Sequence, residues 1–299
     1  MRWELRPCDG GETALSQDLL VTYYLHSGFS CALGKVLLVF DYWLGEHGEL
    51  SEQRRITDRT LSRYDEIYVF VSHAHPDHYD PVINDWHDRF PVTYIVSSDM
   101  PIGARGKRMA PGDSLAFGEH VTVRAFDSTD LGVSFLVTLD GIHIFHAGDL
   151  NFWHWREEST VQEIDEAEQA FHAACEPLAG ETIDLAFFPV DPRQGRLFDA
   201  GANYFIMTAK PRLLIPMHFW GRSEVAEEFA RRARCRATEV IALVRPQERL
   251  KLSFAEDGFM TIKPLAYRAF GSDEEETEVA LPDEGDVFAE TDLPVNLEL

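Results

Sequence analysis

The segment from Val69 to Pro81 reads VFVSHAHPDHYDP, and it holds three histidines and an aspartate within six residues of one another. The residues from Glu66 to Ser72 are mostly β-branched and aromatic, which predicts a buried strand that ends just before His73. Four ionisable side chains packed at the end of a buried strand lose hydration, so something must compensate them. A bound metal ion is the compensation that these residue types favour.

The spacing inside this segment predicts two directions for its side chains. His73 and His75 lie two positions apart in extended chain, so their imidazoles face the same way. Pro76 disfavours a helical conformation at His75 and turns the chain, which directs Asp77 and His78 to a second position. The segment can therefore serve two ions.

Two further ligand-type residues follow apolar strands elsewhere in the chain. Asp149 lies in the stretch IHIFHAGDLN, and His218 lies in the stretch LLIPMHFW. Imidazole and carboxylate groups suit zinc, manganese or iron. We therefore expect one or two divalent ions, with zinc as the first choice.

The composition is that of a folded, soluble enzyme. The chain has 299 residues, of which 45% are hydrophobic, and no run approaches the roughly 18 apolar residues of a membrane helix. Its four cysteines lie far apart without CxxC spacing, which favours the cytoplasm over an oxidising compartment. A net charge of −24 argues against nucleic acid as a partner, because phosphate binding is driven by basic clusters. The sequence leaves the oligomeric state open.

The acidic charge is concentrated at the C-terminal end. Residues 272–299 hold eleven acidic side chains and no basic one, which is typical of a flexible, solvated tail. No internal repeat or linker divides the rest of the chain. We therefore predict one domain over residues 1–271 and an acidic tail over 272–299.

Strand and helix signals alternate along the body. Asp140-Gly141, between two β-rich runs, is the strongest hairpin signal. Thr160 and Glu163 form a capping box that opens a helix towards Cys175. Many strands, some in hairpins, with a few helices among them predict an α/β sandwich. The predicted strands cover residues 19–25, 36–41, 66–72, 92–96, 121–126, 133–139, 142–146, 183–189, 213–217 and 240–244.

These motifs resemble those of a known family. The order of His73-Ala-His75-Pro-Asp77-His78, then Gly148-Asp149, then His218 resembles the successive metal motifs of the metallo-β-lactamase fold superfamily. The stretches LHSGFS, LLVFDYW and GVSFLVTLDGIHIFHAGDLN are similar to those of its uncharacterised and lactonase-like hydrolases. The resemblance covers about Leu19 to Trp220. It implies a four-layer αββα sandwich, in which two mixed β-sheets are flanked by helices and the metals lie at the sheet edges.

The resemblance also implies a ligand set. By carry-over, His73 and His75 serve the first metal, whereas Asp77, His78 and His218 serve the second. Asp149 bridges the two.

One element departs from the family pattern. A further histidine of the family normally serves the first metal, but the corresponding stretch here, VTVRAFDSTDLGVSF, contains none. Asp130 is the preferred substitute, because a carboxylate can replace an imidazole, and Asp127 is the second choice. The alternatives are that His154 supplies the ligand, or that a single ion is bound mainly by Asp77, His78, Asp149 and His218.

The expected reaction is hydrolysis of an ester, lactone, amide or phosphodiester bond in a small molecule by metal-bound hydroxide, since a divalent ion lowers the pKa of bound water to about 7. The candidate catalytic residues are Asp77, His154 and His26, and the candidate substrate-binding residues are Arg193, Arg222 and Trp153. A purely structural role is an equal alternative for His26 and His154. For Arg193 and Arg222 the alternative is that they are solvated at the surface.

Three other functions use the same residues. An iron-dependent oxygenase or oxygen reductase on the same fold is the main alternative, because loss of a histidine favours iron. An RNA-processing nuclease is disfavoured by the acidic charge and the lack of a basic arm. A non-catalytic binding protein would have no need for six ligand-type residues.

Overall fold

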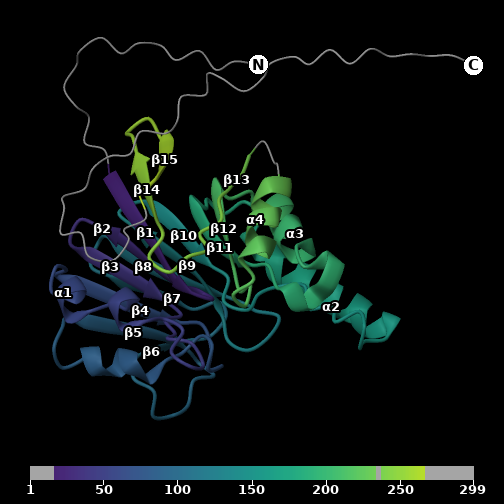
Figure 1. Ribbon diagram of the computed structural model, residues 1–299, viewed down its shortest axis with the longest axis horizontal. Coiled ribbons are helices and arrows are strands. Elements are labelled where there is room, and N and C mark those ends of the chain that lie inside the picture. The colour runs from purple at the N-terminus through teal and green to yellow at the C-terminus, as the bar shows by residue number, and fades with distance from the viewer. Residues whose placement is uncertain (1–16, 234–236, 267–299) are drawn as a thin grey trace, which may run out of the picture.

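The computed structural model describes residues 17–233 and 237–266 of the chain. The predicted acidic tail, 272–299, lies outside the described residues. Within the described ranges, no helix has both the length and the apolar character that crossing a bilayer requires. The described chain folds into two mixed β-sheets packed face to face, with helices on both outer faces (Figure 1). This confirms the predicted αββα sandwich.

Among the described residues, eight strands form the first sheet, in the order β15-β14-β1-β2-β3-β4-β5-β6. Strands β3 to β6 run parallel to one another, whereas β15, β14, β1, β2 and β3 are joined by antiparallel pairings. Their bounds are β1 (Gln17–Leu25), β2 (Gly28–Leu33), β3 (Val36–Phe40), β4 (Glu66–Val71), β5 (Val92–Ser97), β6 (Lys107–Met109), β14 (Arg249–Phe254) and β15 (Met260–Pro264).

Seven strands of the described chain form the second sheet, in the order β13-β12-β11-β10-β9-β8-β7. Its bounds are β7 (Ser114–Phe117), β8 (Val121–Phe126), β9 (Ser134–Leu139), β10 (Ile142–His146), β11 (Leu185–Pro189), β12 (Leu213–Met217) and β13 (Glu239–Val240). The Asp140-Gly141 turn joins β9 to β10 as predicted, with both residues at positive φ, 46° and 83°. From β10 to β13 the strands run parallel.

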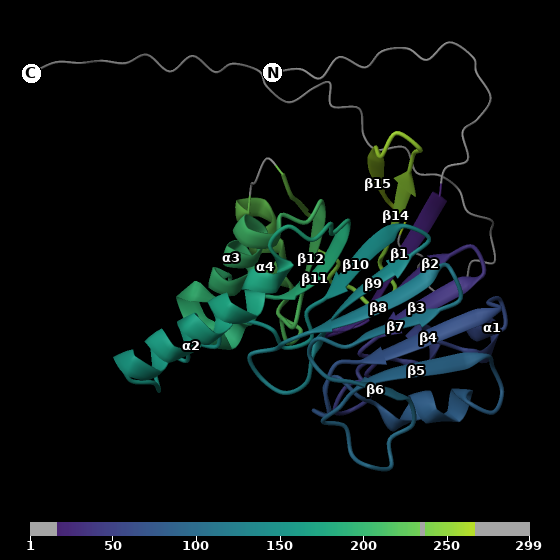
Figure 2. The same ribbon diagram turned by 180° about the vertical axis from the view of Figure 1, so that it is seen from behind.

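Helices cover the outer face of each sheet. The α-helices are α1 (Asp58–Leu61), α2 (Val161–Cys175), α3 (Ala200–Ala209) and α4 (Ser223–Arg232), and the 3₁₀ helices are η1 (Glu52–Arg54), η2 (Pro81–Trp86), η3 (Glu176–Leu178) and η4 (Pro192–Leu197). Helix α2 begins at the predicted capping box, where Thr160 and Glu163 satisfy each other's backbone N–H groups. Helices α2, α3 and α4 lie together beside the second sheet, whereas α1 lies at the first sheet (Figure 2).

Strands β3 and β4 are buried on both faces, as parallel strands covered by helices are. In β3, Leu38 and Phe40 join the core between the sheets, while Leu37 and Val39 join the core beneath α1 and η2. The two sheets meet through aromatic stacking, such as Phe29 on Phe187 with ring centroids 4.1 Å apart. The alternation of buried side chains fixes the register of the strands, and with it the edge at which they end.

The strands that precede the candidate site residues run towards one edge of the sandwich. In the first sheet β1, β3 and β4 run in the same direction, and in the second β10, β11 and β12 do. Parallel strands place the residues that follow them in one crevice, where ligand sites of open α/β sheets also lie. The polar residues at this edge form the candidate site.

Candidate metal centre

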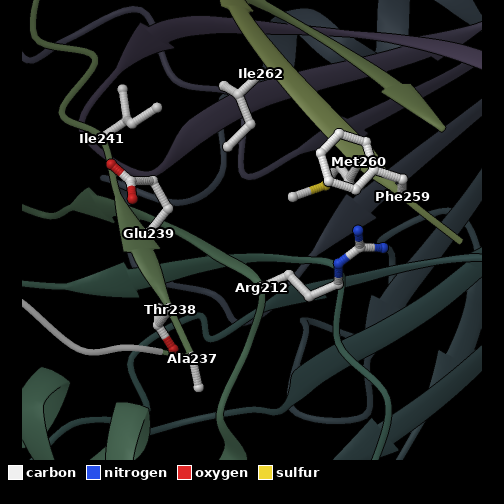
Figure 3. A pocket seen from close by; sticks show the side chains of 8 residues that line it. All are labelled: Arg212, Ala237, Thr238, Glu239, Ile241, Phe259, Met260 and Ile262. Carbon is white, nitrogen blue, oxygen red and sulfur yellow. The ribbon is translucent and has the colours of Figure 1, made fainter. Parts of the chain in front are cut away.

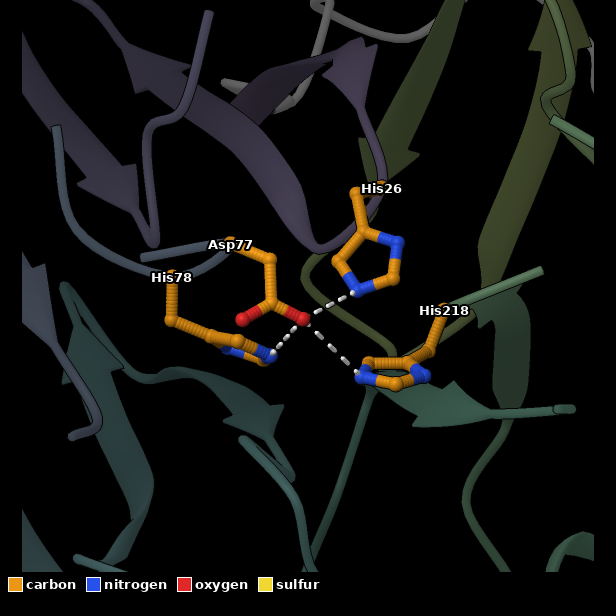
Figure 4. A group of neighbouring side chains, drawn as sticks. All are labelled: His26, Asp77, His78 and His218. Atoms are coloured by element: carbon orange, nitrogen blue, oxygen red, sulfur yellow. Dashed lines mark ion pairs between the residues drawn. The ribbon is translucent and has the colours of Figure 1, made fainter. Parts of the chain in front are cut away.

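Within the described residues, two groups of side chains are close enough together to hold a metal ion, and both lie at this edge. The second group consists of His26, Asp77, His78 and His218. Asp77 Oδ2 lies 3.2 Å from His26 Nε2, 3.9 Å from His78 Nε2 and 3.8 Å from His218 Nε2 (Figure 4). Three imidazoles from three strand ends therefore surround one carboxylate oxygen.

The first group consists of His73, His75 and Asp149. His73 Nε2 lies 3.0 Å from His75 Nδ1 and 3.4 Å from Asp149 Oδ2. His73 is buried, and its Nδ1 lies 2.9 Å from the Ser72 hydroxyl. This group offers two nitrogen atoms and one oxygen atom.

Asp149 touches both groups. Its Oδ2 faces His73, whereas its Oδ1 lies 3.0 Å from His78 Nε2 and 3.2 Å from His218 Nε2. A carboxylate with one oxygen towards each group has the geometry of a bridging ligand. The side chain is almost fully buried, so water does not replace these contacts.

The unpartnered atoms of the centre fit a divalent cation. Five buried polar atoms of the two groups have no hydrogen-bond partner among the described residues, namely His26 Nδ1 and Nε2, His78 Nε2, Asp149 Oδ1 and His218 Nε2. The imidazoles of His78 and His218 lie close to Asp149 Oδ1, but their angles to that oxygen do not satisfy the geometry of a hydrogen bond. Buried polar atoms without partners are costly, by about 1–3 kcal/mol each. Nitrogen and oxygen lone pairs that converge in this way are what zinc, manganese or iron binds.

Two buried carboxylates orient the histidines from behind. Asp41 Oδ2 lies 2.7 Å from His78 Nδ1, and Asp191 Oδ2 lies 2.9 Å from His218 Nδ1. In each pair the carboxylate accepts the Nδ1–H of the imidazole, so Nε2 is the ring nitrogen that faces the centre. Asp41 is held in turn by the backbone N–H and the hydroxyl of Ser72, at 2.8 and 2.6 Å.

The charges of the centre compensate one another. Burial by itself raises the pKa of Asp149, but the neighbouring imidazoles of His78 and His218 outweigh it and hold that pKa well below its usual range. Burial by itself lowers the pKa of His78, but Asp149 and Asp41 outweigh it and raise that pKa well above its usual value. His26 differs, because burial and the nearby His218 lower its pKa to about 3. The His26 imidazole is therefore neutral at pH 7 and has a lone pair to offer.

The backbone around the centre is strained. His26, Asp41, Trp155, His218 and Trp220 all have positive φ angles, between 38° and 63°. In residues other than glycine such angles cost about 1–3 kcal/mol each, and they persist where the surrounding structure enforces them. His26 and His218 belong to the second group, and Asp41 bonds His78 of that group. Trp155 and Trp220 are aromatic side chains beside it.

Asp130, the predicted substitute ligand, does not reach the centre. It is exposed, as is Asp127, and it belongs to neither group. The reason lies in Gly132 of the same loop, which packs its backbone directly on Ser72 and His73. A Cβ at Gly132 would lie 2.0 Å from Ser72 O and 2.6 Å from His73 Cβ. At position 132 the loop therefore meets the first group with backbone, and no side chain fits at that position.

We expect Asp130→Ala to leave the metal content unchanged, because its carboxylate is in solvent. The number of ions per chain, measured by elemental analysis after dialysis, checks this. Loss of an ion from this variant would return Asp130 to the first group.

Other predicted residues lie around the centre. Trp153 donates its indole N–H to Asp149 O at 2.8 Å and contacts the His218 ring edge-on at 5.7 Å. His154 is buried but belongs to neither group, and its contacts are with Gln194 and Leu197. Its backbone N–H donates to Gln194 Oε1 at 3.1 Å. The structure therefore brings Trp153 to the centre and leaves His154 behind it.

The two predicted substrate arginines differ in their surroundings. Arg193 bonds Asp191, which connects it to His218. Arg222 bonds Glu224 at 2.9 Å, and both of those side chains are more than half exposed. The structure thus connects Arg193 to the centre and gives Arg222 a surface partner.

The sequence did not reveal that Asp41 and Asp191 lie behind His78 and His218, and it indicated His26 as a catalytic candidate and not as a member of a candidate ligand group. All three residues follow buried strands, namely β3, β11 and β1. The same signal identified Asp149 and His218, and it would have found these residues as well.

A separate cavity lies at the opposite edge of the second sheet. It has a volume of about 640 Å³ and is lined by residues around the start of β12, β13 and β15, including Arg212 and Phe259 (Figure 3). Arg212 precedes β12, whereas His218 follows that strand, so this cavity is remote from the two ligand groups. It contains neither of them.

No protein-family model matches the chain. A curated relative, the UPF0173 metal-dependent hydrolase of Opitutus terrae, is 24% identical over 258 residues, which are 78% of this chain and 99% of the relative.

Solved structures share the fold at low sequence identity. Igni18, a metallo hydrolase of Ignicoccus hospitalis, has a TM-score of 0.56 and 15% identity, over 78% of this chain and 98% of its own. The metallo-β-lactamase fold protein YhfI of Bacillus subtilis has a TM-score of 0.50 and 15% identity, over 82% and 99%. A variant of the β-hydroxylase CmlA has a TM-score of 0.53 and 13% identity, over 78% of this chain and 53% of its own.

Proposed function

We propose, from the premise that this chain has the fold of the metallo-β-lactamase superfamily, that it is a metal-dependent hydrolase acting on a small molecule. The observation that carries the proposal is the pair of ligand groups that meet at Asp149, with buried nitrogen atoms that have no hydrogen-bond partner among the described residues. The name of the curated relative, a metal-dependent hydrolase, supports the same conclusion.

We assign the first ion to His73, His75 and Asp149, and the second to Asp77, His78, His218 and the shared Asp149. The second ion also takes His26, whose neutral imidazole belongs to the same group. Zinc is the first choice for these donors, with manganese and iron as the other metals that suit them.

A divalent ion in this position supplies water of lowered pKa, about 7, and polarises the oxygen of the bond to be broken. The protein contributes Asp77, whose pKa is held below its usual range by the imidazoles of His26, His78 and His218 despite burial. The carboxylate therefore stays ionised and suits the task of accepting a hydrogen bond from the attacking water and orienting it. Burial of the centre keeps other water out, which strengthens these interactions.

The substrate is a small molecule with an ester, lactone, amide or phosphodiester bond. Trp153 and Arg193 are the substrate-binding residues that the geometry supports, since one contacts His218 directly and the other through Asp191. A nucleic-acid substrate conflicts with the net charge of −24. We expect the protein in the cytoplasm, which agrees with the buried free thiols of Cys31 and Cys175.

The second candidate is an iron-dependent oxidation. It is supported by the shared fold of the β-hydroxylase CmlA and by the first group, which offers only three ligand atoms among the described residues. Open coordination positions are a feature of iron oxygenase sites.

The deciding experiment is elemental analysis of protein purified without added metal, followed by a hydrolysis screen over esters, lactones, amides and phosphodiesters. We expect one or two ions per chain, zinc for preference, and hydrolysis that is lost with chelator and restored with metal. Redox-active iron with no hydrolysis would favour the oxidation instead. A protein that binds no metal under any condition would refute both.

A further inference from the structure

A cavity of about 640 Å³ lies beside the metal centre, and its lining residues belong to neither of the two candidate ligand groups. It is lined by two segments, residues 155–158 and residues 192–197. The first follows Asp149 and Trp153 along the chain, and the second follows Asp191. Both segments therefore start at residues that belong to the centre or support it.

This cavity is rich in arginine in a chain that is poor in basic residues. Only 27 of the 299 residues are lysine or arginine, whereas three of the ten lining residues are, namely Arg156, Arg193 and Arg196. Glu157 and Glu158 are also at its wall, and both are exposed. We call this cavity the arginine pocket.

Arg193 is held rigidly at the wall of the arginine pocket. Its Nε and Nη2 bond Asp191 Oδ2, at 3.0 and 2.6 Å, and its Cζ lies 5.4 Å from the Trp155 ring and 4.7 Å from the Trp220 ring. Stacking between two indoles and a forked bond to a carboxylate fix the plane of the guanidinium. Its Nη1 has no hydrogen-bond partner among the described residues, and 47% of the side chain is exposed. A fixed cationic donor thus remains available to a ligand.

The floor of the pocket adds an unpaired donor. Gln194 is 5% exposed and lines the cavity. Its Oε1 accepts from His154 N, but its Nε2 has no hydrogen-bond partner in the described part of the chain. A buried amide donor without a partner adds positive potential beneath the arginines.

The arginine pocket is connected to the metal centre by direct contacts. Asp191 accepts hydrogen bonds from both Arg193 and His218. Trp220 lies against His26 with ring centroids 4.5 Å apart, and the Arg193 guanidinium lies over the same indole at 4.7 Å. Trp220 thus contacts both the Arg193 guanidinium and the His26 ring of the second group.

We infer that the arginine pocket binds an anionic group of the substrate, a carboxylate or a phosphate, so that the preferred substrates are small anions with a second, hydrolysable group. This inference rests on the proposed hydrolase function. A strongly acidic protein repels anions over most of its surface, whereas the three arginines of this pocket outnumber its two glutamates and Arg193 keeps a fixed donor for an anion. Anchoring the remote anion also orients the scissile bond, which raises the rate as well as the affinity.

The binding test uses isothermal titration calorimetry on the metal-loaded protein, with glutarate and inorganic phosphate as probes and the neutral glutaramide as their control. We expect the anions to bind and glutaramide not to bind. Arg193→Gln is expected to weaken anion binding by about 10- to 100-fold, the usual value of a charge-assisted contact. Tighter binding of phosphate or of glutarate identifies which anion the pocket accepts.

A matched control is Arg124→Gln. Arg124 also bonds a carboxylate, Glu181, at 2.8 Å and lies over an aromatic ring, Phe126, at 4.9 Å, but neither the ligand groups nor the arginine pocket include it. We expect this variant to bind the probes as the wild type does. Anions that bind directly to the metal would be insensitive to Arg193→Gln, so equal affinity of that variant and the wild type would overturn the inference. Arg156→Gln, which does not touch Asp191, is a second variant with an expected loss of about three-fold.

The catalytic test compares two esters of equal chain length, the 4-nitrophenyl monoester of glutaric acid and 4-nitrophenyl pentanoate. Arg193→Gln is expected to lower the ratio of their kcat/KM values by about 10- to 100-fold. An equal loss on both esters would show that Arg193 only positions Asp191 and His218, which overturns the inference. If the wild type hydrolyses neither ester, the proposed esterase activity fails, while calorimetry still decides whether the arginine pocket binds anions.

Discussion

Asp149→Ala is expected to release the metal of both groups and to abolish hydrolysis. The carboxylate touches His73 with one oxygen and both His78 and His218 with the other, and the described residues offer no other carboxylate between the groups. Outer partners of metal ligands typically contribute 10- to 100-fold to affinity or activity. Loss of a shared ligand should therefore exceed about 100-fold in kcat/KM.

The measurement for Asp149→Ala is ions per chain by elemental analysis after dialysis, together with the rate on the best ester of the screen. Asp184→Asn is the matched control. Asp184 is also a buried carboxylate of the second sheet, but it bonds His143 and Arg212 at the opposite end of that sheet. Full metal content in Asp149→Ala would contradict the bridging role, and equal metal loss in both variants would point to unfolding instead.

Gly132→Ala is expected to destabilise the fold by about 3 kcal/mol or more and to empty the first group. The new Cβ would lie 2.0 Å from Ser72 O, which is backbone and cannot rotate away, and 2.6 Å from His73 Cβ. The φ of 79° adds strain for any residue other than glycine. Overpacking and left-handed strain each cost about 1–3 kcal/mol, so their sum is large for one methyl group.

The control for Gly132→Ala is Gly141→Ala. Gly141 has a similar φ of 83° in the hairpin turn, but a Cβ there has no atom within 4 Å. We expect it to lose only the strain, about 1–2 kcal/mol. Urea unfolding of both variants in chelator measures the free energy of unfolding without the metal, and elemental analysis then reports ions per chain. Equal destabilisation would mean that the loop yields and that the backbone contact does not shape the first group.

Most of the candidate ligands were predicted from one physical signal, a polar residue within three positions of the end of a buried apolar strand. That signal gave His73, Asp149 and His218, and the structure places all three at the common edge. It was applied incompletely, since Asp41 and Asp191 carry it too. These two carboxylates act on His78 and His218 across chain separations of 37 and 27 residues, which no local pattern reveals.

The prediction of Asp130 failed for a different reason. It assumed that the loop before β9 must supply a side chain to the first group. The structure shows a loop that supplies backbone instead, at Gly132, with Val133 N donating to Ser72 O at 3.0 Å. The sequence shows a glycine at position 132, but it does not show that the backbone of Ser72 and the side chain of His73 pack against that glycine.

Most of the predicted strands agree closely with the structure. The ranges for β3, β4, β5, β8, β9, β10 and β12 agree within one residue at either end. Strand β2 was missed because its sequence, GFSCAL, has small and polar residues although every one is buried. Strands β14 and β15 were missed because they mix charged with apolar residues, and β15 is also the edge strand of its sheet.

The predicted strand over 240–244 was wrong in its extent. The structure has only β13, Glu239–Val240. The backbone N–H of Val244 donates to Glu248 Oε2 at 2.7 Å, and that of Arg245 to the same oxygen at 3.0 Å, so the chain turns there. The Glu248 carboxylate therefore accepts hydrogen bonds from two backbone N–H groups that a longer strand would have used for pairing.

The strained backbone at His26, Asp41, Trp155, His218 and Trp220 has a consequence for engineering this protein. Glycine adopts positive φ at no steric cost, but at these five positions it would remove a side chain of the centre or its wall together with the packing and hydrogen bonds that the side chain makes. Stabilisation by glycine is therefore not available at these five positions. Libraries meant to raise the melting temperature should hold them constant and vary Lys210 and Gln247, whose positive φ angles of 51° and 72° serve turns away from the metal.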